Sequence, residues 1–169
     1  VAEVLSSMMR KNHDGLLDIA DQNNISVGTG ATGKGLYFEA EFPAKNLSKT
    51  LNLLDQGVIN IDLNENNFEK AKRDVKNNFE TAQPSAFDNI RSTLFPDSSR
   101  GYSNTDILNN VDNVTLEDVK GLFQYIKDNG SFSIAASLPT DKYPQSKTVF
   151  DNTLENMPTF KPNTPRIFN

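Results

Sequence analysis

The sequence contains no cysteine, only one histidine and no long apolar run. The lack of cysteine excludes disulfide bonds and thiolate metal sites, and it fits either a reducing cytoplasm or a cell-envelope protein stabilised by its core alone. The apolar stretches are too short for a membrane span or a signal peptide. We therefore expect a soluble domain, and the sequence does not decide between the cytoplasm and the cell envelope.

Basic residues are the minority charge. The chain has 17 Lys and Arg against 22 Asp and Glu, giving a net charge of −5 and a pI near 4.9. The lysines are interspersed with carboxylates, which argues against a nucleic-acid-binding surface and against binding to an anionic membrane. A length of 169 residues suits one domain with a single core.

One glycine-rich stretch, GTGATGKG, begins at Gly28 and resembles a nucleotide-binding loop. Gly28, Gly33 and Lys34 match most of the pattern G-x-x-x-x-G-K-[ST], but Gly35 replaces the hydroxyl that ligates magnesium. The following residues alternate with a period of two, where the motif requires a helix. We therefore predict a β-hairpin over residues 24–42, in which glycine supplies positive φ angles and not an anion site.

Alternation in the second predicted strand gives it two different faces. One face is apolar and consists of Leu36, Phe38, Ala40 and Phe42; the other carries Tyr37, Glu39 and Glu41. A strand with this pattern has one buried side and one polar side.

Helical spacing of apolar residues predicts most of the remaining elements. We expect helices from Val1 onward, over 14–22, 44–56, 65–82, 85–95 and 115–130, and around Phe150. Several apolar side chains on these helices should face inward, among them Leu16, Leu17, Ile19, Phe87, Ile90, Leu94 and Phe95. Alternation predicts a further strand over 132–138, and DSSRGYSNTD, starting at residue 97, predicts a polar loop.

This order of elements predicts an α+β fold with a mainly antiparallel sheet and helices packed on one face. A doubly wound nucleotide fold would need regular alternation of strand and helix, which the sequence lacks. The predicted core residues are Leu51, Phe68, Val75, Phe79, Ile90, Leu122, Phe123 and Ile134.

Four segments in this order resemble one unit of the insulinase or pitrilysin-type metallopeptidases. They are VAEVLSSMM, ENNFEKAKRDVKNNFET, IRSTLFPDSSRGYS and NVTLEDVKGLFQYIKDNGSFSIAASLP. The resemblance covers most of the chain, but the opening strands of the unit are absent. It implies a mitochondrial-processing-peptidase-like metallohydrolase half, with residues 1–169 forming a single domain and a fragment of a larger two-unit or four-unit protein.

Active members of the resembled family carry the inverted zinc motif H-x-x-E-H on their first helix. The resemblance places Glu3 and Ser7 at the positions of the two histidines and Ser6 at the position of the general base. The third ligand, a glutamate, falls near Asn77 or Asn78. The resemblance therefore implies a unit without catalytic or zinc-binding residues. The single histidine, His13, cannot replace a set of three ligands, and we expect it in a solvated loop.

The implied role is that of a structural, substrate-enclosing unit. A homologous zinc-bearing unit, in cis or in trans, would supply the metal and the hydrolysis of a peptide substrate. The resemblance also assigns one face of the sheet to the substrate chamber, namely Tyr37, Glu39, Glu41, Ser133 and Ser137. The alternative for this face is a solvated polar surface, which is common in antiparallel sheets. The alternative is a pseudoenzyme, a peptide- or protein-interaction module with no catalytic partner.

Overall fold

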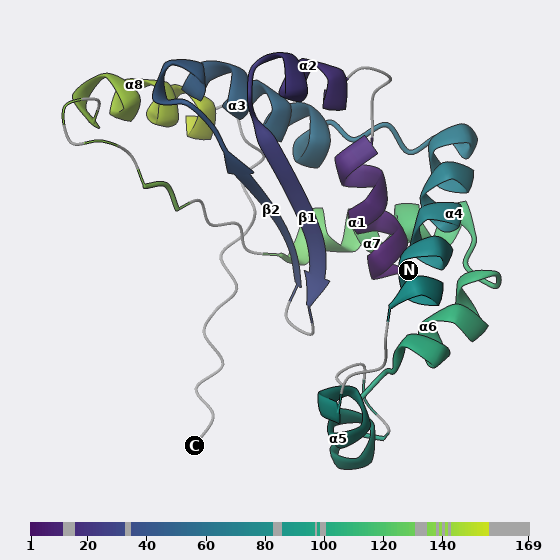
Figure 1. Cartoon of the computed structure of the whole chain (residues 1–169). Coiled ribbons are helices and arrows are strands. Elements are labelled where there is room, and N and C mark those ends of the chain that lie inside the picture. The colour runs from purple at the N-terminus through teal and green to yellow at the C-terminus, as the bar shows by residue number, and fades with distance from the viewer. Residues whose placement is uncertain are drawn as a thin grey trace.

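The computed structural model describes residues 1–11, 16–32, 35–82, 86–96, 98, 101–130, 135–137, 139, 141 and 143–155 (Figure 1). Helices dominate, and the described strands form one two-stranded antiparallel sheet, which confirms the α+β class. The α-helices and strands are α1 (Ala2–Lys11), α2 (Leu16–Gln22), β1 (Ser26–Thr32), β2 (Gly35–Glu41), α3 (Leu47–Leu54), α4 (Glu65–Thr81), α5 (Ala86–Leu94), α6 (Asn104–Val111), α7 (Leu116–Asn129) and α8 (Tyr143–Glu155), and a 3-10 turn, Ala44–Asn46, precedes α3.

The predicted hairpin is present. Strands β1 and β2 pair antiparallel, with Thr29 opposite Phe38 and Val27 opposite Ala40. Because Gly35 opens a strand and not a helix, the glycine-rich stretch lacks the helix N-terminus that a nucleotide-binding loop requires. Residues 33 and 34 lie outside the described part of the chain.

Helix α1 is the centre of the fold. It lies between the hairpin and α4, with α7 behind it (Figure 1). Val4, Leu5 and Met8 are buried, and they pack with apolar side chains of α4, α6 and α7, namely Phe68, Ala71, Val75, Val111 and Val119. This burial accounts for the helical spacing at the start of the sequence, since residues three and four apart share one helix face.

The inner face of the hairpin covers this core. Side chains of β2 alternate between half-buried and exposed, as predicted, and Leu36 packs against the main cluster. Ala40 and Phe42 pack instead on a smaller cluster formed by Ala20, Ile25 and Leu53.

A short π-helical segment, Asp55–Ile59, continues α3 and brings Gly57 against α1. A Cβ atom on Gly57 would lie 2.9 Å from the carbonyl oxygen of Met9 and 3.4 Å from the ring of Phe38. Glycine is therefore the residue that allows this segment and α1 to approach so closely.

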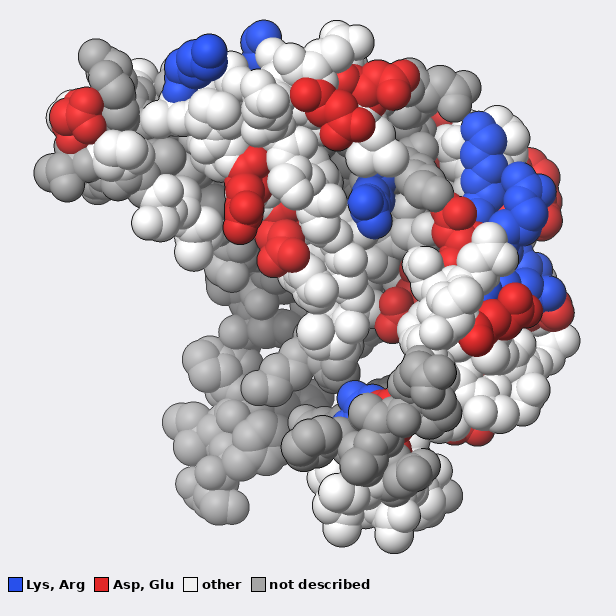
Figure 2. Space-filling model, viewed as in Figure 1, with Lys and Arg blue, Asp and Glu red and all other residues white. Residues whose placement is uncertain are grey.

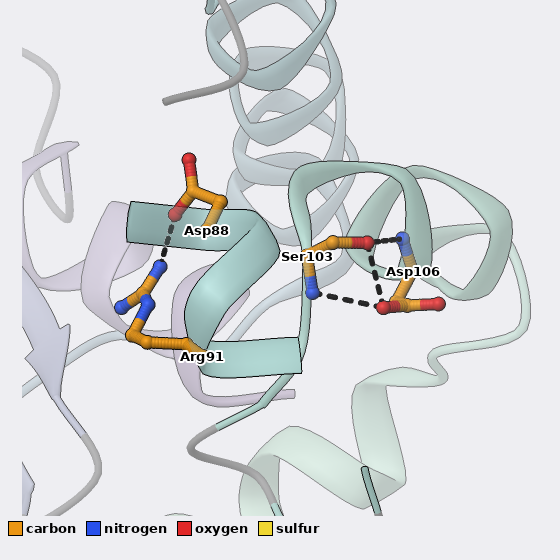
Figure 3. A network of polar contacts seen from close by, with 4 residues as sticks. All are labelled: Asp88, Arg91, Ser103 and Asp106. Carbon is orange, nitrogen blue, oxygen red and sulfur yellow. Dashed lines mark hydrogen bonds and ion pairs between the residues drawn. The ribbon is translucent and has the colours of Figure 1, made fainter. Parts of the chain in front are cut away.

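Capping boxes begin two of the helices. At α7, the Thr115 hydroxyl accepts from the backbone N–H of Asp118 at 3.2 Å, and the Asp118 carboxylate accepts from the backbone N–H of Thr115 at 2.9 Å. The predicted helix start at Thr115 is thus confirmed, with aspartate in the place of the usual glutamate. Ser103 and Asp106 form the same pair at α6 (Figure 3).

Helix α6 corrects the predicted polar loop, because residues 104–106 of that stretch are helical. The helix is short and rich in asparagine, and Val111 is its one buried apolar side chain. The serine–aspartate box and contacts with α4 hold it in place. Helix α6 contains too few apolar residues at helical spacing for the sequence pattern to predict it.

Several side chains predicted to be buried are exposed. Ile90, Leu94 and Phe95 in and after α5 are 52%, 65% and 42% exposed, so the prediction of a buried α5 face is wrong. Within the described residues, α5 makes few contacts with other elements; its Arg91 pairs with Asp88 on the same helix (Figure 3). Ile19 is also exposed, because α2 turns Ala20 inward instead.

Other core predictions are confirmed or fall outside the described residues. Leu51, Phe68 and Val75 are buried, while Phe79, Leu122 and Phe123 are partly buried against the main cluster. Most of the predicted strand over 132–138, including Ser133 and Ile134, is not described, and 135–137 have no strand structure. His13 is likewise outside the described ranges. No helix among the described residues is long and apolar enough to cross a membrane.

Candidate functional site

A cavity of about 170 Å³ lies where α1, β1 and α4 meet. The structure brings Glu3, Ser6 and Ser7 of α1 to this cavity together with Asn78 of α4. These four residues occupy the positions at which the sequence resemblance implied a lost zinc site. The other lining residues are Arg10, Thr29, Asp74, Val75 and Phe79, whereas Asn77 is not among them.

The helix period explains how α1 presents this polar set. Glu3, Ser7 and Arg10 are spaced by four and three residues, so they share one side of the helix, next to the buried stripe of Val4, Leu5 and Met8. The hairpin fixes this side in place, because the Thr29 hydroxyl donates a hydrogen bond to the carbonyl oxygen of Ser6 at 2.9 Å.

Burial differs strongly between the polar groups of the cavity. Ser6 is only 3% exposed, and its carbonyl oxygen accepts the hydrogen bond from Thr29. Burial also raises the pKa of the Glu3 carboxyl, and the nearby amino terminus opposes this shift. The cavity therefore holds a partly desolvated carboxyl beside a buried serine residue.

The residue types at the cavity do not fit a catalytic zinc ion. Such an ion takes three protein ligands from histidine, cysteine, aspartate or glutamate, and the described residues that line the cavity offer only the carboxylates of Glu3 and Asp74. In the described part of the chain, no three such side chains are placed to hold a metal. Serine and asparagine at the remaining positions are neutral, and they supply neither ligands of that kind nor a general base.

The outer face of the hairpin is the second candidate surface. Tyr37 is 45% exposed, and Glu39 and Glu41 are exposed beside it, on the side away from α1. Figure 2 shows acidic side chains gathered over this part of the hairpin. Ser137 is exposed in a segment without strand structure, and Ser133 is not described, so the structure does not join these two serines to this face.

Two glycines of β1 shape the outer face. Gly28 and Gly30 lie opposite Glu39 and Tyr37, and the longer side chains lie across them. A Cβ atom on Gly28 would be 2.6 Å from a carboxylate oxygen of Glu39, and one on Gly30 would overlap the Tyr37 ring. Neither Gly28 nor Gly30 has a positive φ, so the predicted reason is wrong for these two, whereas Gly35 at the start of β2 has a φ of 158°. Gly28 and Gly30 are needed for close cross-strand approach.

A larger hollow of about 350 Å³ lies between α2 and β1 and shares Arg10 with the first cavity. Among the described residues that line it, Asp21 is the one titratable side chain apart from Arg10. Sequence reasoning missed Arg10, Thr29 and Asp74 at the smaller cavity. The four-and-three spacing from Glu3 was a signal for Arg10, but nothing local to β1 or α4 pointed to the other two.

No known family model and no curated protein matches this sequence.

Proposed function

We propose that this chain is a non-catalytic, substrate-enclosing unit of a zinc metallopeptidase of the insulinase or pitrilysin type. Hydrolysis would belong to a homologous zinc-bearing unit, in cis or in trans. The observation that carries the proposal is the meeting of Glu3, Ser6, Ser7 and Asn78 at one cavity between α1 and α4. Asn78 on α4 is distant in sequence from the three residues of α1, yet all four positions, which the resemblance assigns to one lost site, line the same cavity.

The chemistry of that cavity supports a role in binding. Its side chains can accept and donate hydrogen bonds, but they cannot assemble the ligands that activate a zinc-bound water. The outer hairpin face supports enclosure of an extended peptide, because it presents Tyr37, Glu39 and Glu41 on one side of a strand. An acidic wall of this kind favours basic peptides, and salt weakens the attraction.

The test uses the full-length parent protein or the complex that contains this chain, with a basic peptide as substrate at low ionic strength. Reversing two charges on the outer face, with Glu39→Lys and Glu41→Lys, should weaken binding of the basic peptide and lower its turnover. The matched control is Glu69→Lys with Glu80→Lys on α4. It reverses the same number of charges away from the hairpin, so affinity for the peptide and its turnover should change little. Unchanged affinity and turnover in the hairpin variant would refute the chamber-wall assignment.

A second measurement separates the proposal from the alternative of an interaction module. Chelation should abolish peptidase activity of the parent, and the activity should return with zinc, whereas the isolated chain should neither cleave peptides nor bind zinc stoichiometrically. A parent assembly with no chelator-sensitive peptidase activity would favour the module without a catalytic partner. Tight stoichiometric zinc on the isolated chain would contradict both.

A further inference from the structure

Helix α6 depends on contacts with other parts of the chain to stay folded. It has eight residues, and an isolated helix shorter than about 12 residues is marginal in water. Val111 is its one buried apolar side chain, and Ile107 is partly buried against the main cluster. Its exposed residues are polar, namely Thr105, Asp106, Asn109 and Asn110. Apolar burial therefore contributes little to the docking of this helix.

The C-terminal end of α6 receives its cations from a different helix. The last turn of α6 has no basic residue, although the free carbonyl groups at a helix C-terminus favour a positive charge. Lys72 of α4 donates hydrogen bonds from Nζ to the carbonyl oxygens of Asp112 at 3.1 Å and Val114 at 3.0 Å. We call these two hydrogen bonds the Lys72 clamp. Lys76, one turn further along α4, pairs with the Asp112 carboxylate at 2.6 Å.

The Lys72 clamp is anchored on the core of the protein. Phe68 precedes Lys72 by one turn of α4, is buried in the main cluster, and has its ring centroid 5.1 Å from the Lys72 ammonium. This cation–π contact holds the ammonium beside the turn between α6 and α7. The pair of Lys76 and Asp112 is more exposed, with 36% and 64% of the two side chains accessible, so it contributes less.

We propose that the Lys72 clamp controls a local opening, in which α6 leaves α4 while α1, α4 and α7 stay folded. Segments that open locally have few buried apolar contacts and rely on exposed polar ones, as α6 does. The helices α1, α4 and α7 contribute Leu5, Phe68 and Val119 to one buried cluster, which persists without α6. This inference goes beyond the proposed function and does not rest on it.

Opening of α6 would also change the position of α5. Helix α5 directly precedes α6 in the chain, makes few contacts with other described elements, and lies at the end of the molecule remote from α2 and α3 (Figure 1). It carries the exposed apolar side chains of Ile90 and Leu94. Since α5 is held mainly through its connection to α6, a change that neutralises the Lys72 ammonium favours movement of this apolar surface.

The experiment measures amide hydrogen exchange of the 169-residue chain by NMR. It compares the amides of residues 107–111 in α6 with those of residues 5–8 in α1, after correction for intrinsic exchange rates. Because exchange of helical amides reports the free energy of the opening that exposes them, the α6 amides should exchange at least about tenfold faster than the α1 amides. Equal rates would mean that α6 opens only together with the whole fold, and would overturn the proposal.

Variants test whether Lys72 controls the opening. Lys72→Met keeps the apolar stem and removes the ammonium, so it should speed exchange in α6 by about tenfold and leave α1 unchanged, because hydrogen bonds from a charged group are the stronger ones. Asp112→Asn removes the partner of Lys76 but keeps the carbonyl that Lys72 binds, and it should have a smaller effect. The matched control Arg73→Met removes an exposed cation from the same helix and should change neither helix.

Three results with these variants would overturn the proposal. The first is unchanged exchange of α6 in Lys72→Met. The second is loss of the fold, or acceleration of α1 as large as that of α6, because Lys72 would then support the whole structure and not a local opening. The third is an effect of Arg73→Met or Asp112→Asn on α6 as large as that of Lys72→Met, because the opening would then depend on charge in general and not on the Lys72 clamp.

Discussion

The hydroxyl of Thr29 on β1 donates a 2.9 Å hydrogen bond to the carbonyl oxygen of Ser6 in the middle of α1. This bond joins the hairpin to the central helix beside the cavity, across 23 residues of sequence. It fixes the inner face of the hairpin relative to the polar side of α1. Because side chains alternate along a strand, the outer face is directed away from α1.

Replacing Thr29 with valine should destabilise the fold by about 1 kcal/mol, because the shape is kept and the hydrogen bond is lost. Thr29→Ser retains the hydroxyl and should recover most of that loss. Urea unfolding followed by circular dichroism measures both variants. Equal stability of the valine and wild-type proteins would mean that the contact contributes no net stability.

Alanine at two glycines should have opposite effects. Gly57→Ala places a methyl group against the backbone of Met9, which cannot move aside, and should cost about 1 to 3 kcal/mol. Gly121→Ala in α7 meets nothing within 4 Å and should stabilise the helix by about 1 kcal/mol. Thermal unfolding of the two variants gives the comparison, and a shift in the same direction for both would contradict it.

The pair of Gly30 and Tyr37 should behave as a coupled unit on the outer face. Gly30→Ala displaces the tyrosine ring that lies across the glycine, so we expect a loss of stability in the wild-type background and none in the Tyr37→Ala background. The coupling energy in this double-mutant cycle should be about 1 kcal/mol. Additive effects would show that the ring contributes nothing through its contact with the glycine.

The contribution of the α7 capping box to folding stability should decrease at acidic pH. Hydrogen bonds from the side chain and, to a smaller extent, the backbone of Thr115 lower the pKa of Asp118. The capping box therefore contributes its full stability above the ordinary pKa of 3.8, and this stability is lost as the pH falls through the lowered pKa. Thr115→Ala should cost about 1 kcal/mol near neutral pH and less in acid. The exposed Thr105→Ala is the control, and a pH-independent cost would contradict the assignment.

The contribution of Glu3 to folding stability should depend on pH in the opposite direction. Burial raises its pKa, so the folded state binds more protons than the unfolded state between the ordinary value of 4.5 and the raised one. Its contribution therefore becomes less favourable as pH rises through that interval. Glu3→Gln should be more stable than the wild type at neutral pH, and the difference should vanish below pH 4.5. Denaturant unfolding at several pH values checks this sign, and a variant less stable at neutral pH would reverse it.

Local signals in the sequence determined much of the secondary structure. The period-two pattern from Leu36 to Phe42 predicted the hairpin, and the three-and-four spacing of Phe68, Ala71 and Val75 predicted α4, because each period matches the geometry by which that element buries one face. The capping residues at Thr115 located the start of α7. These features depend on neighbours within one turn or one strand, and the chain itself supplies them.

Only the tertiary structure decided which apolar faces are covered and which polar residues meet. Ile90 and Leu94 have the spacing of a buried helix face, yet they are exposed, because burial depends on whether another element packs there. Thr29, Asp74 and Arg10 come together with Glu3 through the packing of α1 between β1 and α4. Gly28 and Gly30 are explained by the strand register that sets them opposite Glu39 and Tyr37. Such contacts join residues that are distant in sequence, and no local period encodes them.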